Sequence, residues 1–136
     1  TKHSKCVVVT HAMALWEMRH YGTALRGCAG PGDRMLQYSS AFWGAAVFGQ
    51  LDLALAFGAC SVVVSAQTPE EIASACAAHS VSVLGVVPSQ LRGAWPGGPG
   101  TKPPSLRTVV AWADRFPVEL AREWATAVHV RELLIA

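Results

Sequence analysis

The middle of the chain alternates between two hydrophobic patterns. Residues 61–65 and 81–87 are short valine-rich runs without charge, which is the pattern of strands buried on both faces. Between them, the apolar residues from Ile72 to Ala77 recur at helical spacing. This stretch therefore predicts a strand, a helix and a second strand. We expect the two strands to be parallel neighbours joined by a right-handed crossover.

The predicted helix has a clear start at Thr68-Pro69-Glu70-Glu71. The Thr68 hydroxyl can accept a hydrogen bond from the Glu71 amide, while the Glu71 carboxylate reaches back to the backbone of Thr68. Pro69 suits the first helical turn, and the two acids face the positive end of the helix. These signals predict a capped helix directly after the first strand.

The same alternation extends over the rest of the chain. Further strands are predicted at residues 5–10, 35–39, 106–111 and 129–136. Further helices are predicted at residues 11–26, 42–57, 89–95 and 117–127. In the helix at 42–57, Gly44 and Gly49 indicate close packing or a break, and Gly58 ends it. We predict an α/β fold with three layers, in which a mostly parallel sheet has helices on both faces.

The composition narrows the class of protein. A chain of 136 residues is long enough for one domain with a real core. Its 51% hydrophobic and 15% charged residues indicate a piece whose surfaces are partly covered by other protein. The net charge of +2, without a basic run, argues against nucleic-acid binding. We find no membrane-spanning run and no secretory signal, and without an initiating Met we expect the chain to be cut from a longer protein.

The cysteines and histidines give no support for a metal site. The cysteines, which form no C-x-x-C pair, are Cys6, Cys28, Cys60 and Cys76. Cys60 and Cys76 lie in a predicted strand and helix, where cysteine acts as a small hydrophobic residue. We predict reduced thiols in a cytoplasmic protein. The histidines fit no ligand spacing, and no spacing identifies a catalytic residue.

Several segments, in this order, resemble motifs of the adenylate-forming superfamily, the AMP-dependent synthetases and ligases. They are residues 5–11 (KCVVVTH), 31–40 (PGDRMLQYSS), 46–64 (AVFGQLDLALAFGACSVVV), 68–92 (TPEEIASACAAHSVSVLGVVPSQLR), 105–125 (SLRTVVAWADRFPVELAREWA) and 132–136 (ELLIA). The likeness is strongest to the adenylation domains of non-ribosomal peptide synthetases. We interpret residues 1–136 as a partial domain of this kind, truncated at both ends, because the loop expected after the last strand lies beyond Ala136.

The resemblance implies ATP-dependent activation of a carboxylic or amino acid. The acid attacks the α-phosphate of ATP, pyrophosphate leaves, and a carrier-protein or coenzyme A thiol usually takes the acyl group afterwards. ATP and Mg²⁺ are the implied cofactors, and carrier-protein or neighbouring synthetase domains are the implied partners. The family's lid domain and its YGPTE-type motif have no counterpart here, so we expect no catalysis by this chain alone.

The resemblance assigns a phosphate loop and an adenine-side segment, both altered. The family's TGKPKG loop matches residues 1–6, where Thr1, Ser4 and Lys5 would contact phosphate but both glycines are replaced. The alternative is a basic surface segment. The family's GGE matches Trp112-Ala113-Asp114. Asp114 keeps the acid, whereas the Trp112 indole either stacks on adenine or blocks the space.

The substrate pocket also departs from the family pattern. The matching positions are Trp43, Gly44, Phe48, Gly85, Val109 and Ala111. Amino-acid-activating members carry an acid near positions 43–45, and this chain has none there. Because a buried ammonium group without a carboxylate is costly, the substrate lacks an α-amine, as in aryl or fatty acids, or no substrate binds. The alternative for Trp43, Phe48 and Phe57 is ordinary core.

Two other functions stay open at this point. The chain could be a non-catalytic interaction module, a decayed adenylation domain that uses its apolar faces within a larger synthetase. It could also be a generic nucleotide-binding α/β module, although it has no G-x-G-x-x-G or Walker loop.

Overall fold

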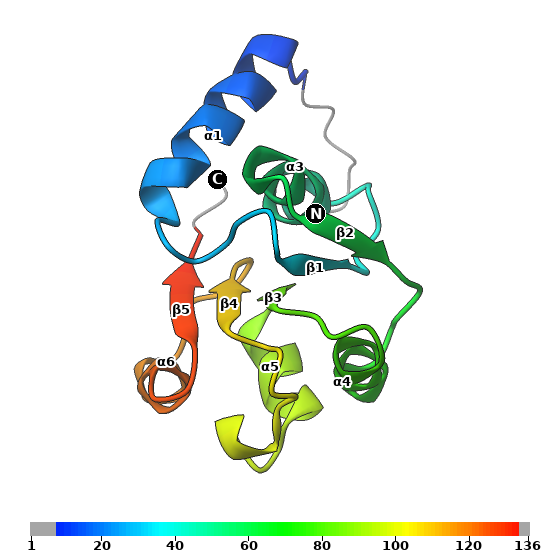
Figure 1. Ribbon diagram of the computed structural model, residues 1–136, viewed down its shortest axis with the longest axis vertical. Helices are drawn as coiled ribbons and strands as arrows, with labels where there is room; N and C mark the ends of the chain where they lie inside the picture. Colours follow the sequence, from blue (N-terminus) through cyan, green and yellow to red (C-terminus); the bar gives the residue numbers. More distant parts are fainter. Residues whose placement is uncertain (1–7, 134–136) are drawn as a thin grey trace, which may run out of the picture.

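The computed structural model describes residues 8–133, and they form a five-stranded parallel sheet between two layers of helices (Figure 1). The order of the strands across the sheet is β2-β1-β3-β4-β5. The strands are β1 (Arg34–Gln37), β2 (Cys60–Val63), β3 (Val83–Val86), β4 (Thr108–Ala111) and β5 (His129–Glu132). The predicted α/β class, with a parallel sheet and helices on both faces, is confirmed.

The helices divide between the two faces of the sheet. One face is covered by α1 (His11–Ala24) and by a continuous helical segment that comprises α2 (Gly44–Ala46), the π-helical turn η1 (Val47–Leu51) and α3 (Asp52–Phe57). The other face is covered by α4 (Pro69–Ala78), α5 (Pro88–Ala94) and α6 (Val118–Ala125), as Figure 1 shows. A short 3-10 turn, η2 (Pro99–Thr101), lies in the loop before β4.

Side chains alternate between the two faces along each strand. In β4, Val109 and Ala111 pack beneath α4–α6, whereas Val110 packs beneath α1 and α3. Trp112, the residue after β4, continues this alternation and belongs to the α1 and α3 side. This alternation decides which residues can reach a ligand at the carboxyl edge of the sheet.

The predicted pairing of β2 with β3 is wrong, although both strands are parallel. β1 lies between them, with Leu36 opposite Val62 on one side and Met35 opposite Val83 on the other. Met35 and Leu36 are both fully buried, so β1 has an apolar side chain on each face and takes the central place. β2 exposes Cys60 and Val63 and lies at the sheet edge.

The predicted strand at residues 5–10 is also wrong over its described part. Residues 8–10 belong to no strand, and the side chain of Val8 is 84% exposed. Thr10 is instead the N-cap of α1, since its hydroxyl accepts a hydrogen bond of 3.3 Å from the Met13 amide. Residues 5–7 lie outside the described residues.

The predicted start of α4 is confirmed. The Glu71 amide donates to the Thr68 hydroxyl at 3.3 Å, and the Thr68 amide donates to the Glu71 carboxylate at 3.1 Å. The backbone hydrogen bonds from Gln67 and Thr68 lower the pKa of Glu71. Cys76 in this helix is buried, and burial raises the pKa of its thiol to about 12. Cys60 does not act as the expected buried residue, because β2 is at the edge.

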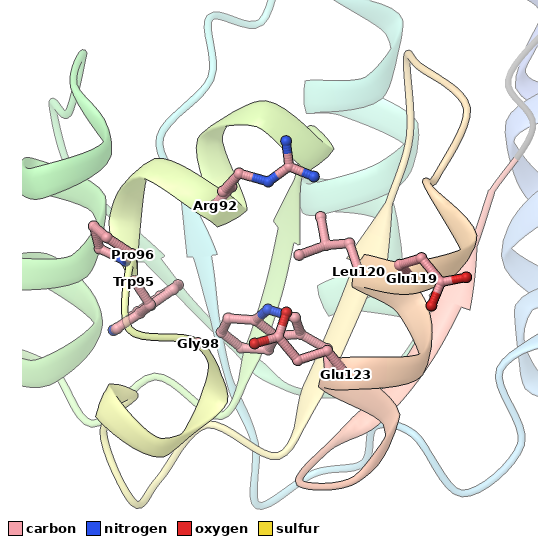
Figure 2. Close-up of a pocket in the computed structure, with 8 residues that line it drawn as sticks. Arg92, Trp95, Pro96, Gly98, Glu119, Leu120 and Glu123 are labelled. Atoms are coloured by element: carbon pink, nitrogen blue, oxygen red, sulfur yellow. The ribbon is translucent and has the colours of Figure 1, made fainter.

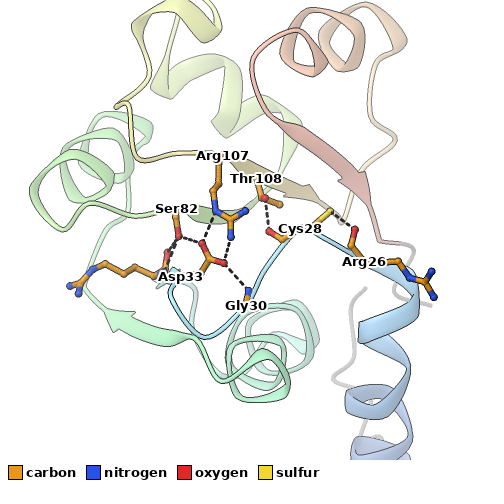
Figure 3. A network of polar contacts seen from close by, with 8 residues as sticks. Arg26, Cys28, Gly30, Asp33, Ser82, Arg107 and Thr108 are labelled. Carbon is orange, nitrogen blue, oxygen red and sulfur yellow. Dashed lines mark hydrogen bonds and ion pairs between the residues drawn. The ribbon is translucent and has the colours of Figure 1, made fainter.

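The amino ends of the strands are joined by a polar network centred on the buried Asp33 (Figure 3). Its carboxylate accepts hydrogen bonds from the Ser82 hydroxyl at 2.6 Å, from Arg107 Nε at 2.8 Å and from the Gly30 amide at 2.7 Å. Burial opposes ionisation of Asp33, but these hydrogen bonds and the Arg107 charge outweigh it and lower its pKa. The network links the start of β1 to those of β3 and β4.

Candidate functional site

A cavity of about 390 Å³ lies at the carboxyl ends of β1, β3 and β4. After β1 the chain leaves to form β2, and it returns across β1 to form β3, so the connections diverge between β1 and β3. In open α/β sheets, ligands bind at such a switch point. Aromatic side chains that line the cavity are Tyr38, Trp43 and Trp112, and polar ones are Ser39, Ser40, Gln67 and Gln90.

A hydrogen bond joins the residue after β1 to α5 at one wall of the cavity. The Tyr38 hydroxyl donates to Gln90 Oε1 at 3.0 Å. Burial raises the pKa of Tyr38 to about 12, so the phenol keeps its proton at neutral pH and remains a donor. The Gln90 amide nitrogen has no part in this hydrogen bond.

The loop after β1 is positioned by two glutamines. Gln50 in η1 is fully buried, and its Nε2 donates to the Gly85 carbonyl at 3.3 Å and to the Ser39 hydroxyl at 3.5 Å. The Ser39 amide donates to Gln50 Oε1 at 3.4 Å, and Gln37 Nε2 donates to the Ser39 carbonyl at 3.0 Å. The π-helical turn places Gly49 and Gln50 both in buried positions.

Trp112 forms the inner wall of the cavity. Its indole is only 4% exposed and lies against Gly49 of η1 and Gly85 of β3. A Cβ added at Gly49 would lie 2.9 Å from Trp112 Cζ3, and one added at Gly85 would overlap Cη2 at the outer edge of the indole. The predicted close packing at Gly49 is confirmed, and its partner is this tryptophan.

The next residue, Ala113, has a backbone conformation that favours glycine. Its φ is +66°, in the left-handed region, where a Cβ is strained. Ala113 also lines the cavity. The turn after β4 therefore keeps a glycine-like backbone although both positions of the expected glycine pair are replaced.

The fold places the site residues assigned by the resemblance on opposite faces of the sheet. Trp43, Trp112 and Ala113 line the cavity, and Gly85 lies beneath Trp112. Val109 and Ala111 are buried on the opposite face of the sheet, beneath α4–α6. Their side chains therefore point away from Gly85.

The remaining assigned residues do not line the cavity. Gly44 lies in α2, Phe48 in η1, and Asp114 is exposed, with its carboxylate accepting from the Arg115 amide at 2.8 Å. Trp43 is 69% exposed, so its interpretation as core is wrong. The assigned phosphate residues Thr1, Ser4 and Lys5 lie outside the described residues.

Three residues at the cavity were not predicted from the sequence: Tyr38, Gln50 and Gln90. Tyr38 lies near the end of the predicted strand at 35–39, and Gln90 follows the predicted strand at 81–87, so their places near strand ends were a usable signal. Gln50 is a lone amide in a nearly charge-free helix, and a polar group in such a setting needs a partner. Its partners Ser39 and Gly85 come from other elements, which the local pattern does not reveal.

The described lining of the cavity is uncharged. No Asp, Glu, Lys or Arg side chain lines it within residues 8–133. Its aromatic and amide walls fit a planar, uncharged group such as an adenine or an aryl ring, but they supply no cation for phosphates. Over the same residues, no cluster of three or more His, Cys, Asp or Glu side chains could hold a metal ion. None of the described helices has the length and apolar character needed to cross a membrane.

A second hollow, of about 250 Å³, lies between α5 and α6 (Figure 2). Trp95 and Trp124 line it in an edge-to-face pair with ring centroids 5.5 Å apart. Arg92 borders it from α5, and Glu119 and Glu123 border it from α6. Within residues 8–133 it shares no lining residue with the cavity at the β1–β3 switch point.

The family model for the AMP-binding enzyme matches residues 1–135. This chain belongs to the AMP-binding enzyme family. A comparison with curated protein sequences gives no match. The parallel sheet with helices on both faces is thus the fold of a chain in this family.

Solved structures share the fold. The non-ribosomal peptide synthetase FmoA3, bound to AMPPNP, superposes with a TM-score of 0.78 at 23% identity, over 96% of this chain and 15% of that one. The Vibrio cholerae adenylation domain AlmE, in complex with glycyl-adenosine-5'-phosphate, gives 0.78 at 22%, over 96% and 25%. The N-terminal domain of FACL13 from Mycobacterium tuberculosis gives 0.78 at 18%, over 96% and 33%. This chain therefore spans a third or less of each of these structures.

Proposed function

We propose that this chain forms part of the large domain of an enzyme that activates a carboxylic acid with ATP as an acyl-adenylate. The observation that carries the proposal is the cavity at the β1–β3 switch point of an AMP-binding family chain. ATP and Mg²⁺ are the cofactors of this proposal. The acid is the substrate, and carrier-protein or neighbouring synthetase domains are the partners.

The described residues that line the cavity are uncharged, so they would bind and orient the substrates without stabilising phosphate charge. Bound ATP would supply the α-phosphate on which the acid is activated. Trp43 at the exposed rim offers a face for stacking a planar ring, and the Gln90 amide can donate to a ring nitrogen or carbonyl. Tyr38 fixes Gln90 through its hydroxyl. Ordered walls of this kind accelerate reactions by holding the reacting groups in place.

The uncharged lining of the described cavity indicates which class of acid would bind. An amino acid brings an α-ammonium group, and burying it without a carboxylate partner is costly. Since no acidic side chain lines the described cavity, we favour an acid without an α-amine, such as an aryl or aliphatic acid. An amino acid that bound here as tightly as its deaminated analogue would contradict this assignment.

Calorimetry with AMP tests whether this cavity is the nucleotide site. Ser40 is exposed and lines the cavity, so Ser40→Trp fills it without disturbing the core. We expect this variant to weaken AMP binding by about tenfold or more. Glu123→Trp, which alters the hollow between α5 and α6, is the matched control and should leave binding unchanged. The reverse pattern would contradict the proposal.

We also propose that the 136-residue chain does not catalyse on its own, because no cationic group lines its described cavity. ATP–pyrophosphate exchange, measured with a panel of amino, aryl and aliphatic acids, is the test. Exchange above background by this chain alone would show that its residues suffice for activation.

A non-catalytic interaction module is the second candidate, favoured by exposed apolar side chains in the α1 and α3 layer. Met13, Trp16 and Leu55 are each half exposed or more. For an interaction module within a larger synthetase, Trp16→Glu with Leu55→Glu should weaken association with the neighbouring domains and leave the unfolding temperature unchanged. Unchanged association would count against this role.

A further inference from the structure

The tightest packing around the cavity involves Trp112 and two glycines from other elements. The indole occupies space in which neither Gly49 of η1 nor Gly85 of β3 could carry a side chain without a shift. Trp112 also lines the cavity, so one side chain both fills the interior and forms the cavity wall. The space taken by the indole therefore adjoins the cavity directly.

We infer that Trp112 is a specificity-determining residue, because it closes an inner extension of the cavity and restricts the bound acid to a short or rim-lying acyl group. The inference rests on the proposed function for the identity of the ligand as an acid. The geometry of the closure itself does not depend on that function.

The closed space has a defined chemistry. Trp112 packs in a cluster with Leu53 of α3, Val83 of β3 and Val110 of β4. Two polar side chains lie at this cluster: Gln50 donates to the Gly85 carbonyl and to Ser39, and the Tyr21 hydroxyl donates to the Phe48 carbonyl. An opened extension would thus be apolar, and apolar holes of about 150 Å³ stay dry and take up small aromatic molecules. With Trp112 in place, a long or bulky acyl group has no room between η1 and the sheet.

Indole is the direct probe, because it matches the side chain removed in Trp112→Gly and carries no carboxylate. We expect indole to raise the unfolding temperature of the full 136-residue Trp112→Gly chain and to bind it about tenfold or more tightly than the native chain. Trp95→Gly removes a buried tryptophan that lines the other hollow, and it is the matched control. It should lose stability without any change in the size of acid that the chain accepts.

Acid selectivity is the second readout, which a purely structural tryptophan would not alter. In the presence of AMP, we expect Trp112→Gly to bind phenylpropionate at least about tenfold better relative to acetate than the native chain does. If Trp112→Gly takes up indole but neither chain binds an acid, Trp112 does close an extension of the cavity, and the acid-activating function is refuted. Equal indole binding by both chains, or a folded Trp112→Gly chain that takes up neither indole nor the larger acid, would overturn the inference.

The milder variant Trp112→Leu keeps the test decisive if Trp112→Gly does not fold. It leaves a smaller hole in the same apolar cluster, and benzene replaces indole as the probe. We expect benzene to stabilise Trp112→Leu and not the native chain. No difference between these two chains would overturn the inference.

Discussion

Two glycines and one tryptophan determine the inner wall of the site. Gly85 and Trp112 stood out separately in the sequence, but nothing local showed that the indole would lie on the glycine. Their contact depends on the parallel register of β3 and β4, which pairs Val86 with Ala111 and brings Trp112 beside the end of β3. Packing contacts of this kind form between strands, so they cannot be predicted from the sequence of a single segment.

Gly85→Ala should destabilise the fold by about 3 kcal/mol or more, because its Cβ would overlap Cη2 of the Trp112 indole. In a Trp112→Ala background the same substitution should cost little. Urea denaturation of the four chains of this double-mutant cycle measures the coupling. Gly22→Ala is the control, since a Cβ at Gly22 meets no atom within 4 Å. Additive effects of Gly85→Ala and Trp112→Ala would refute the contact.

Ala113→Gly should stabilise the chain by about 0.5–1 kcal/mol, because glycine adopts a φ of +66° without strain. The measurement is the free energy of unfolding in urea. Ala41→Gly, in an exposed turn without positive φ, should instead lose stability. A loss at Ala113 equal to that at Ala41 would mean that the backbone of Ala113 is not left-handed.

At the scale of elements, local signals predicted the five strands of the sheet and the main helices, but not the order of the strands across the sheet. The capping box of α4, the helix after Pro117 and the glycine that ends α3 were all predicted from neighbouring residues. The place of β1 between β2 and β3 was not, because a buried valine-rich strand carries no mark of its partner. Residues 8–10 show the converse, since valines alone do not make a strand without a neighbouring strand to pair with.

Thr68→Ala should cost about 1 kcal/mol, since it removes the side-chain acceptor for the Glu71 amide at the start of α4. Thermal and urea unfolding provide the measurement. Ser74→Ala, at an exposed position in the middle of the same helix, should change stability by much less. Equal effects would show that the capping box contributes nothing to stability.

The network at the amino ends predicts an acid-dependent loss of stability. The pKa of Asp33 is lowered in the folded chain, so the unfolded chain binds more protons in acid. Its contribution is fully present above the pKa of the unfolded carboxyl and is lost as the pH falls through the folded pKa. Asp33→Asn should therefore flatten this part of the curve of unfolding free energy against pH. If the unfolding free energies of the native and Asp33→Asn chains fall equally with decreasing pH, the role of Asp33 is contradicted.

At the scale of the whole molecule, the family resemblance and the general rule for open α/β sheets point to the same place. The resemblance assigned site residues near the ends of β3 and β4. The strand order places the switch point between β1 and β3, where the cavity lies. The resemblance could not separate the two faces of the sheet, so Val109 and Ala111 were placed with Gly85 although they lie on opposite faces.

Backbone amide mapping by NMR tests the central claim most directly. On addition of AMP to the 136-residue chain, we expect shift changes to concentrate at Ser39, Ser40 and Ala113, which line the cavity. The amides of Arg92 and Glu123, at the hollow between α5 and α6, should stay unchanged. Changes centred on that hollow, with the amides at the carboxyl ends of β1 and β4 unmoved, would contradict the account.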